Sequence, residues 1–157
     1  MKILLIQIEK TTETYLNEGI DNYVTRLKNY CSFSTETITM PKAIRQKPHD
    51  EQKKAEALEI QKHLETSDYL ICLDEHGKQF TSVQYAEFLN KRMVAGTKRL
   101  VFLIGGPFGI DKSILDKSSY VMSLSNMTFS HQMIRLFFCE QLYRGFSILK
   151  NEKYHHE

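Results

Sequence analysis

Apolar and polar positions along the chain predict strands and helices that alternate from one end to the other. Short apolar runs of strand length occupy residues 2–8, 69–73, 99–104 and 120–124, and residues 32–40 alternate Phe or Thr with polar neighbours. Because strands that alternate with helices build parallel sheets, this order predicts an α/β fold. We expect a mainly parallel sheet with helices on both faces.

Between the strands, apolar residues recur at the spacing of amphipathic helices. The expected helices span about 11–29, 50–65, 81–93, 111–117 and 130–150. Local signals mark their starts: Thr11, Thr12 and Glu13 supply a cap and an acidic first turn, Thr81 with Gln84 matches a capping box, and Asp111 precedes a short helix.

Two segments depart from this simple alternation. Residues 41–48 are polar and basic, which predicts a mobile loop that faces the substrate. The last helix, over 130–150, is apolar around almost its whole circumference. Because such a helix is buried on both sides, one side is expected to face the sheet and the other a second subunit.

Composition is that of an ordinary globular protein. With 157 residues, 41% of them hydrophobic, the chain is expected to form a single domain over 1–157. No apolar run approaches the ~20 residues of a membrane span. The N-terminal run is short, is broken by Gln7 and lacks a cleavage site, so it predicts a strand and a cytoplasmic protein.

Cysteines and charge exclude some kinds of site. The three cysteines are scattered, which argues against disulfides and a zinc cluster, and we expect no metal. The net charge of +2 does not decide for or against nucleic acid. Basic runs at 42–54 and 91–99 are as compatible with a solvated surface as with a phosphate-binding face.

Three apolar strands end in unusual residues, at 73–77, 104–109 and 124–129. If these strands are neighbours, their loops converge on one pocket at the carboxyl edge of the sheet. The glycines of 105–109 match neither a phosphate loop nor a dinucleotide fingerprint, so a structural turn and a binding loop are both open. A neutral or cationic ligand would suit such a pocket better than a triphosphate.

Polar residues are concentrated in the last fifth of the chain. His131 and Arg135 begin the final helix, and Glu140 and Arg144 follow on it. These side chains can form a catalytic group, but helix capping and a buried polar interface explain the same pattern. No arrangement of Ser, His and Asp or of Cys and His supports hydrolysis.

Four segments together resemble the RlmH family of SPOUT-class 23S rRNA pseudouridine N3-methyltransferases. They are LIGGPFG at 103–109, LSNMTFSHQ at 124–132, EQLYR at 140–144 and YHH at 154–156. Each motif is weak by itself, but four in the right order are specific, and the similarity spans essentially the full chain. Two residues depart from the family pattern: Ser130 stands where proline is common, and Glu9 where glycine is usual.

The resemblance implies a C-terminal deep trefoil knot, a homodimer and S-adenosylmethionine as cofactor. The implied reaction methylates N3 of pseudouridine 1915 in 23S rRNA of the assembled ribosome. The cofactor would contact the ends of three strands, at Leu73, Gly105, Leu124, Ser125, Asn126, Met127, Thr128 and Phe129.

We hypothesise that the RNA side of the site consists of His131, Arg135, Arg144, Tyr154 and His155. An arginine would stabilise the developing uracil anion, and a histidine would accept the proton or order a water. Three alternatives are open: a SPOUT methyltransferase for another RNA such as transfer RNA, a non-catalytic ribosome-associated dimeric module, and a flavodoxin-like domain, which the missing phosphate loop disfavours.

Overall fold

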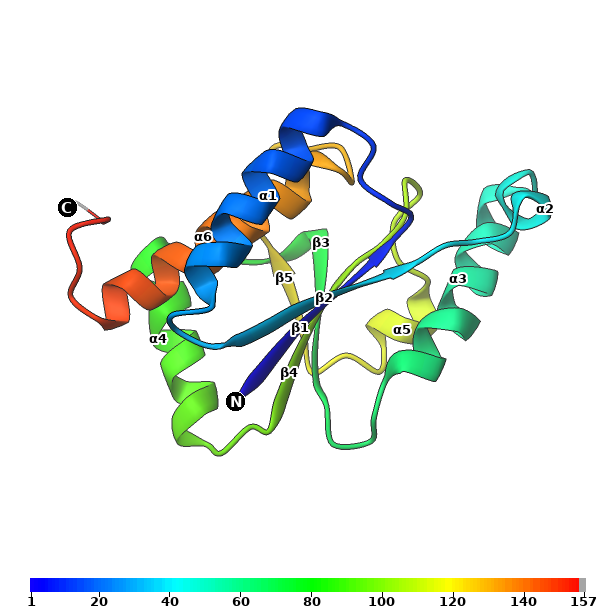
Figure 1. Cartoon of the computed structure of the whole chain (residues 1–157). Helices are drawn as coiled ribbons and strands as arrows, with labels where there is room; N and C mark the ends of the chain where they lie inside the picture. Colours follow the sequence, from blue (N-terminus) through cyan, green and yellow to red (C-terminus); the bar gives the residue numbers. More distant parts are fainter. Residues whose placement is uncertain (156–157) are drawn as a thin grey trace.

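The computed structural model describes residues 1–155 and contains a sheet of five parallel strands in the order β2-β1-β4-β3-β5 (Figure 1). The strands are β1 (Lys2–Ile8), β2 (Ser32–Ile38), β3 (Tyr69–Gln79), β4 (Arg99–Ile104) and β5 (Tyr120–Ser123). The expected parallel α/β sheet is confirmed. The strand order also makes β4, β3 and β5 neighbours, which the convergence of their loops requires.

Helices cover both faces of the sheet, as expected (Figure 1). They are α1 (Thr14–Leu27), α2 (Lys42–Arg45), α3 (His49–His63), α4 (Ser82–Val94), α5 (Lys112–Leu115) and α6 (Met133–Leu149). The helices α1, α4 and α6 share one apolar core with the sheet, and α3 and α5 share the other. Both capping predictions at Thr81 and Asp111 are confirmed by hydrogen bonds to backbone N–H groups.

The alternation within β1 explains how one strand serves both cores. Ile3 and Leu5 belong to the core beneath α1, α4 and α6, and Ile6 and Ile8 belong to the core beneath α3 and α5. All four side chains are essentially inaccessible to solvent. A strand that is apolar on both faces is typical of a parallel sheet between two helical layers.

The start of α1 differs from the sequence prediction. Glu13 occupies the cap position, but its side chain makes no capping hydrogen bond. Thr11 and Thr12 instead bind the beginning of α6: Thr11 Oγ1 accepts a hydrogen bond from Arg135, and the backbone N–H of Thr12 donates to Gln132 Oε1 at 2.8 Å. The two threonines therefore tie the β1–α1 connection to the last helix, a contact between residues about 120 positions apart.

Two other segments also differ from the prediction. Residues 41–48, expected to be a loop, contain the short helix α2. The strand expected to end near Leu73 continues as β3 to Gln79, with a register shift against β5 between Leu73 and Lys78. Gly77 makes this irregularity possible, because a Cβ there would lie 2.5 Å from the Met122 backbone. The bulged residues leave the sheet at its carboxyl edge.

The last helix is largely but not entirely covered. Its buried residues include Phe138, Cys139 and Leu142, whereas Phe137 remains 39% exposed and packs against Phe129 with tilted rings whose centroids are 4.6 Å apart. The exposed apolar patch formed by Met127, Phe129 and Phe137 lies at the start of the helix. No helix within residues 1–155 is both long enough and apolar enough to cross a membrane.

Candidate functional site

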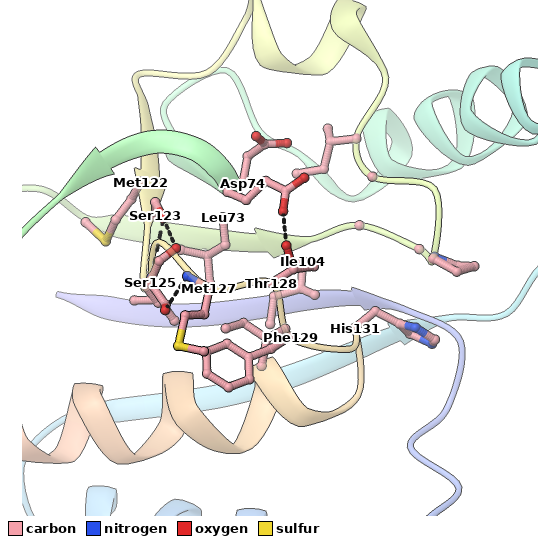
Figure 2. Close-up of a pocket in the computed structure, with 18 residues that line it drawn as sticks. Leu73, Asp74, Ile104, Met122, Ser123, Ser125, Met127, Thr128, Phe129 and His131 are labelled. Atoms are coloured by element: carbon pink, nitrogen blue, oxygen red, sulfur yellow. Dashed lines mark hydrogen bonds between the residues drawn. The ribbon is translucent and has the colours of Figure 1, made fainter.

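A pocket lies at the carboxyl edge of the sheet, where β4, β3 and β5 end side by side (Figure 2). Its wall includes Leu73 and Asp74 from β3, Ile104 from β4 and Met122 from β5. The expected convergence of three strand ends therefore occurs. Because the strands bring only their last residues to the edge, most of the lining comes from the loops that follow them.

The loop after β4 turns tightly against itself. The backbone N–H of Gly109 donates to the carbonyl of Gly106 at 3.1 Å, and Gly109 has a φ of 83°. A Cβ on Gly105 would lie 2.8 Å from the Gly109 carbonyl oxygen. Only glycine fits these positions, so this backbone forms a pocket wall without side chains. The interpretation of the glycine motif as a structural turn is confirmed, and the segment also lines the pocket, where the alternative interpretation places a binding loop.

The loop after β5 forms the opposite wall and is held by its own hydroxyl groups. Ser123 Oγ donates to the Ser125 carbonyl at 2.8 Å, and Ser125 Oγ accepts from the Met127 N–H at 2.9 Å (Figure 2). Thr128 Oγ1 donates to Glu75 Oε2 at 2.7 Å, which joins this loop to the bulge of β3. Together these bonds fix a curved backbone around the cavity.

Most of the predicted cofactor-binding residues line this pocket. Its lining includes Leu73, Gly105, Leu124, Ser125, Met127, Thr128 and Phe129 but not Asn126, which is exposed. The sequence interpretation did not assign Asp74, Glu75 or Gly106 to the site. Both acids belong to the unusual strand end at 73–77, which is the signal in the sequence that points to them.

His131 is the predicted catalytic residue that reaches the pocket. It precedes α6 and lines one side of the cavity (Figure 2). Partial burial lowers the pKa of His131, the positive charge of Arg135 lowers it further, and Glu9 acts in the opposite direction. The imidazole is therefore neutral near pH 7, which leaves one ring nitrogen able to accept a hydrogen bond or a proton.

Arg135 has a different position from the one expected for an RNA-binding residue. Its side chain is 0% exposed, and it donates to the Ile8 carbonyl at 2.6 Å and to Thr11 Oγ1 at 2.8 Å. Burial lowers its pKa to about 10, so it stays charged at neutral pH. Arg135 thus connects α6 to the end of β1, beside the pocket rather than inside it.

We expect Arg135→Leu to lower the free energy of unfolding by about 2–4 kcal/mol. The substitution removes two hydrogen bonds and leaves the buried Ile8 carbonyl without its donor. Urea denaturation checks this, with Arg45→Leu, whose side chain is 52% exposed, as a control expected to change stability by less than about 0.5 kcal/mol. Equal stability of the two variants would show that the buried contacts contribute nothing.

The remaining predicted catalytic residues form a cluster near the C-terminal end of α6. Arg144 donates to Glu140 Oε1 through Nε at 2.9 Å and through its terminal nitrogen at 2.6 Å, and its guanidinium lies 4.7 Å from the centre of the Tyr154 ring. The Tyr154 hydroxyl is 3.1 Å from that of Tyr23, and His155 Nδ1 is 3.4 Å from Arg144. We call these five residues the tail cluster.

Electrostatics keep the tail cluster in defined protonation states. Burial alone would lower the pKa of Arg144, but its hydrogen bonds to Glu140 and the negative charge of Glu140 raise it. Burial and the hydrogen bond to Tyr23 raise the pKa of Tyr154. The cluster therefore presents a permanent cation beside a neutral phenol. His156, the last residue of the YHH motif, lies outside the described residues.

The tail cluster and the pocket are at opposite ends of α6. From Met133 to Arg144 the helix rises about 17 Å, and Figure 1 shows the C-terminal segment on the opposite side of the molecule from the 105–109 loop. One copy of the chain therefore brings His131 to the pocket but not Arg144, Tyr154 or His155.

The two departures from the family pattern each have a local explanation. Glu9 adopts a left-handed backbone conformation with a φ of 63°, which glycine would tolerate without strain. Its carboxylate accepts a hydrogen bond from the Met40 N–H at 2.9 Å. Ser130 Oγ accepts from the Met133 N–H at 3.2 Å, so the serine caps the first turn that a proline would have stiffened. Both turns therefore form with the residues present.

Among residues 1–155, no three His, Cys, Asp or Glu side chains are grouped closely enough to hold a metal ion. The cysteines Cys31, Cys72 and Cys139 are free thiols. Burial raises the pKa of Cys31 to about 11, so this thiol is protonated and unreactive at neutral pH. The polar groups that line the pocket are carboxylates, hydroxyls, the imidazole of His131 and the backbone.

Comparisons with known proteins agree with this geometry. The family model described as "Predicted SPOUT methyltransferase" matches residues 1–155. The chain is 50% identical over 157 residues to the Ribosomal RNA large subunit methyltransferase H of Flavobacterium johnsoniae and 48% identical over 157 residues to that of Parabacteroides distasonis, with 100% of each chain covered.

A solved structure is similar in fold alone. The probable methylase family protein of Haemophilus influenzae superposes with a TM-score of 0.55 over 99% of this chain and 70% of that one, at 14% identity. The full-length similarity to the family and the close relatives lead to one conclusion. This chain belongs to the SPOUT methyltransferase family, and within it to the group that contains the ribosomal RNA large subunit methyltransferases H.

Proposed function

We propose that this protein transfers a methyl group from S-adenosylmethionine to N3 of a pseudouridine in 23S rRNA of the large ribosomal subunit. The observation that carries the proposal is the pocket of three adjacent strand ends in a chain that matches rRNA methyltransferases over its full length. We further propose a single cytoplasmic domain over 1–157, with the trefoil knot that the family resemblance implies.

The pocket fits the chemistry of this cofactor. Leu73, Ile104 and Met122 offer an apolar floor for a flat base, and the glycine backbone allows close approach. Asp74 and Glu75 supply negative charge suited to a cationic ligand. When bound, the cofactor supplies a methyl group on a positively charged sulfur. The residues that would hold it are those of the 73–75, 104–109 and 122–129 walls.

We propose a homodimer in which the tail cluster of one copy closes the pocket of the other. Arg144, Tyr154 and His155 lie too far from their own pocket to act there. The patch of Met127, Phe129 and Phe137 is apolar, exposed and continuous with the pocket rim, as a subunit contact would be. A two-fold axis near the middle of α6, which pairs the two copies of the helix antiparallel, would place each pocket beside the partner's tail cluster.

The proposed residue roles follow from charge. The N3–H proton of the base must leave as the N3–C bond forms and the sulfur–carbon bond breaks. Neutral His131 at the pocket can accept this proton directly or through a water. Arg144 from the partner copy would stabilise the negative charge that develops on the pyrimidine ring. Arg135, being buried, positions the start of α6 and does not contact the substrate.

Mass-spectrometric mapping of rRNA tests the function. We expect ribosomes from a strain without this chain to lack one methylated pseudouridine, and the purified protein to restore it with S-adenosylmethionine. If the purified protein methylates transfer RNA but not ribosomes, the alternative of a SPOUT methyltransferase for another RNA is favoured. Failure to bind S-adenosylhomocysteine at millimolar concentration in calorimetry would favour a non-catalytic module.

A further inference from the structure

Helix α3 directs two polar side chains into the protein although most of its surface is charged and exposed. Gln52 is 8% exposed and Glu56, one turn later, is 6% exposed. Gln52 Nε2 donates to the Lys47 carbonyl at 2.6 Å, which closes the turn between α2 and α3. Glu56 has no such local partner and instead faces the glycine loop of the pocket.

The contact between Glu56 and this loop is close. The Glu56 carboxylate lies against the backbone of Gly106, whose N–H favours the ionised carboxylate and lowers the pKa of Glu56. A Cβ on Gly106 would come within 2.9 Å of Oε1 and 3.1 Å of Oε2. Since Gly106 lines the pocket on its other side, the carboxylate lies directly behind the wall.

Glu9 is the charged group that acts on this carboxylate, and three other titratable side chains interact in turn with Glu9. Glu9, at the end of β1, repels the Glu56 carboxylate, and Arg45 of α2 lies 4.0 Å from Glu9. His131 and Arg135 also interact electrostatically with Glu9. Burial, and then the charge of Glu9, raise the pKa of Glu56 to about 7, and the nearby Gly106 N–H opposes this rise. The carboxylate is therefore partly protonated under ordinary conditions.

We propose that Glu56 is a positioning residue for cofactor binding: its carboxylate holds the Gly106 N–H and so fixes the pocket wall formed by residues 105–109. The proposal rests on the proposed function, because it assumes that this pocket binds the cofactor. Protonation weakens the acceptor, so the loop is held firmly above pH 7 and loosely below it. Glu56 thereby couples the affinity of the pocket to pH.

Calorimetry with S-adenosylhomocysteine tests this in the full-length protein. If only the ionised Glu56 carboxylate holds the 105–109 wall, the affinity for S-adenosylhomocysteine should follow the ionised fraction of Glu56. It should therefore be about tenfold higher near pH 8 than near pH 6. Glu56→Gln keeps an acceptor that does not titrate, so its affinity should not change with pH. Glu56→Ala should bind weakly at both values. Glu59→Gln, on the same helix and 38% exposed, is the matched control and should retain the wild-type pH dependence.

A second measurement separates this proposal from the proposed function. The amide ¹⁵N and ¹H shifts of Gly106 in the ligand-free protein should titrate with a midpoint near 7, and Glu56→Gln should abolish that titration. A Gly106 amide that titrates in a protein unable to bind S-adenosylhomocysteine would contradict the proposed function but not the contact. An unchanged pH dependence of affinity in Glu56→Gln, or a Gly106 amide that does not titrate, would overturn the role of Glu56.

Discussion

Arg144→Ala is expected to reduce the single-turnover rate of methyl transfer to ribosomes about 100-fold to 1,000-fold, which is the range seen when one group that stabilises a developing anion is removed. The affinity for S-adenosylhomocysteine should stay within about twofold, because the tail cluster is remote from the pocket of its own chain and, in the proposed dimer, would meet the partner's pocket on the RNA side. Rapid-quench kinetics and calorimetry measure the two quantities.

Arg92→Ala is a suitable control for this variant. Its guanidinium lies 4.6 Å from the centre of the Tyr69 ring, much as that of Arg144 lies 4.7 Å from that of Tyr154. The control therefore removes a similar arginine–aromatic contact at a place without a proposed role. It should leave methyl transfer unchanged. An Arg144→Ala protein with the wild-type single-turnover rate would exclude Arg144 from the catalytic site.

The second large effect is expected from Gly105→Ala. A Cβ at this position would meet the Gly109 carbonyl oxygen at 2.8 Å and Ile110 Cγ1 at 2.7 Å. The side chain of Ile110 has some freedom to move, but the carbonyl belongs to the turn that Gly106 and Gly109 close. Moving this wall by about 1 Å is expected to lower the affinity for S-adenosylhomocysteine about 100-fold.

A control for Gly105→Ala must separate strain from pocket shape. Gly96 has a φ of 71°, and a Cβ there would meet no atom within 4 Å. Gly96→Ala is therefore strained, at a cost of about 1 kcal/mol, but far from any pocket residue. It should lower thermal stability slightly and leave binding intact. Equal affinity of Gly105→Ala and wild type in calorimetry would show that the glycine loop does not contact the ligand.

The sequence allowed the fold to be predicted because its core residues follow simple periods. In β1 the alternation of Ile3 and Leu5 with Ile6 and Ile8 reports two buried faces directly. The three strand ends could likewise be placed at one edge, since parallel strands end on the same side. The family resemblance implies what periodicity cannot indicate: a candidate ligand and a candidate target base.

The functions of single buried polar residues could not be predicted. Arg135 lies among apolar neighbours on a helix and was interpreted as an RNA-binding group, because a charged side chain is seldom fully buried. Its partner is a carbonyl 127 residues away, a contact that no local pattern encodes. Glu56 lies in the helix predicted over 50–65, where nothing in the sequence distinguishes it from the exposed charged residues around it. Both depend on tertiary contacts.

The bulge in β3 was missed for a similar reason. Asp74 and Glu75 were interpreted as the end of a strand, because acidic residues are uncommon within one. The strand resumes at Lys78 because Gly77 lets its backbone approach Met122 of β5. The pairing of β3 with β5, whose partner residues are about 50 positions apart, therefore determines where β3 ends. The bulge that results places Asp74 and Glu75 in the pocket wall.

The central claim is that the pocket of one copy works with the tail cluster of the other, and mixing two inactive variants tests it directly. Gly105→Ala and Arg144→Ala chains, each checked for folding by circular dichroism, would be unfolded together, refolded and assayed on ribosomes. In a shared site, each mixed dimer contains one pocket and one tail cluster that are both intact. We expect recovery of about a quarter of wild-type activity, because half of the dimers are mixed and each mixed dimer has one working site of its two. If the mixture remains as inactive as the separate variants, the claim is wrong.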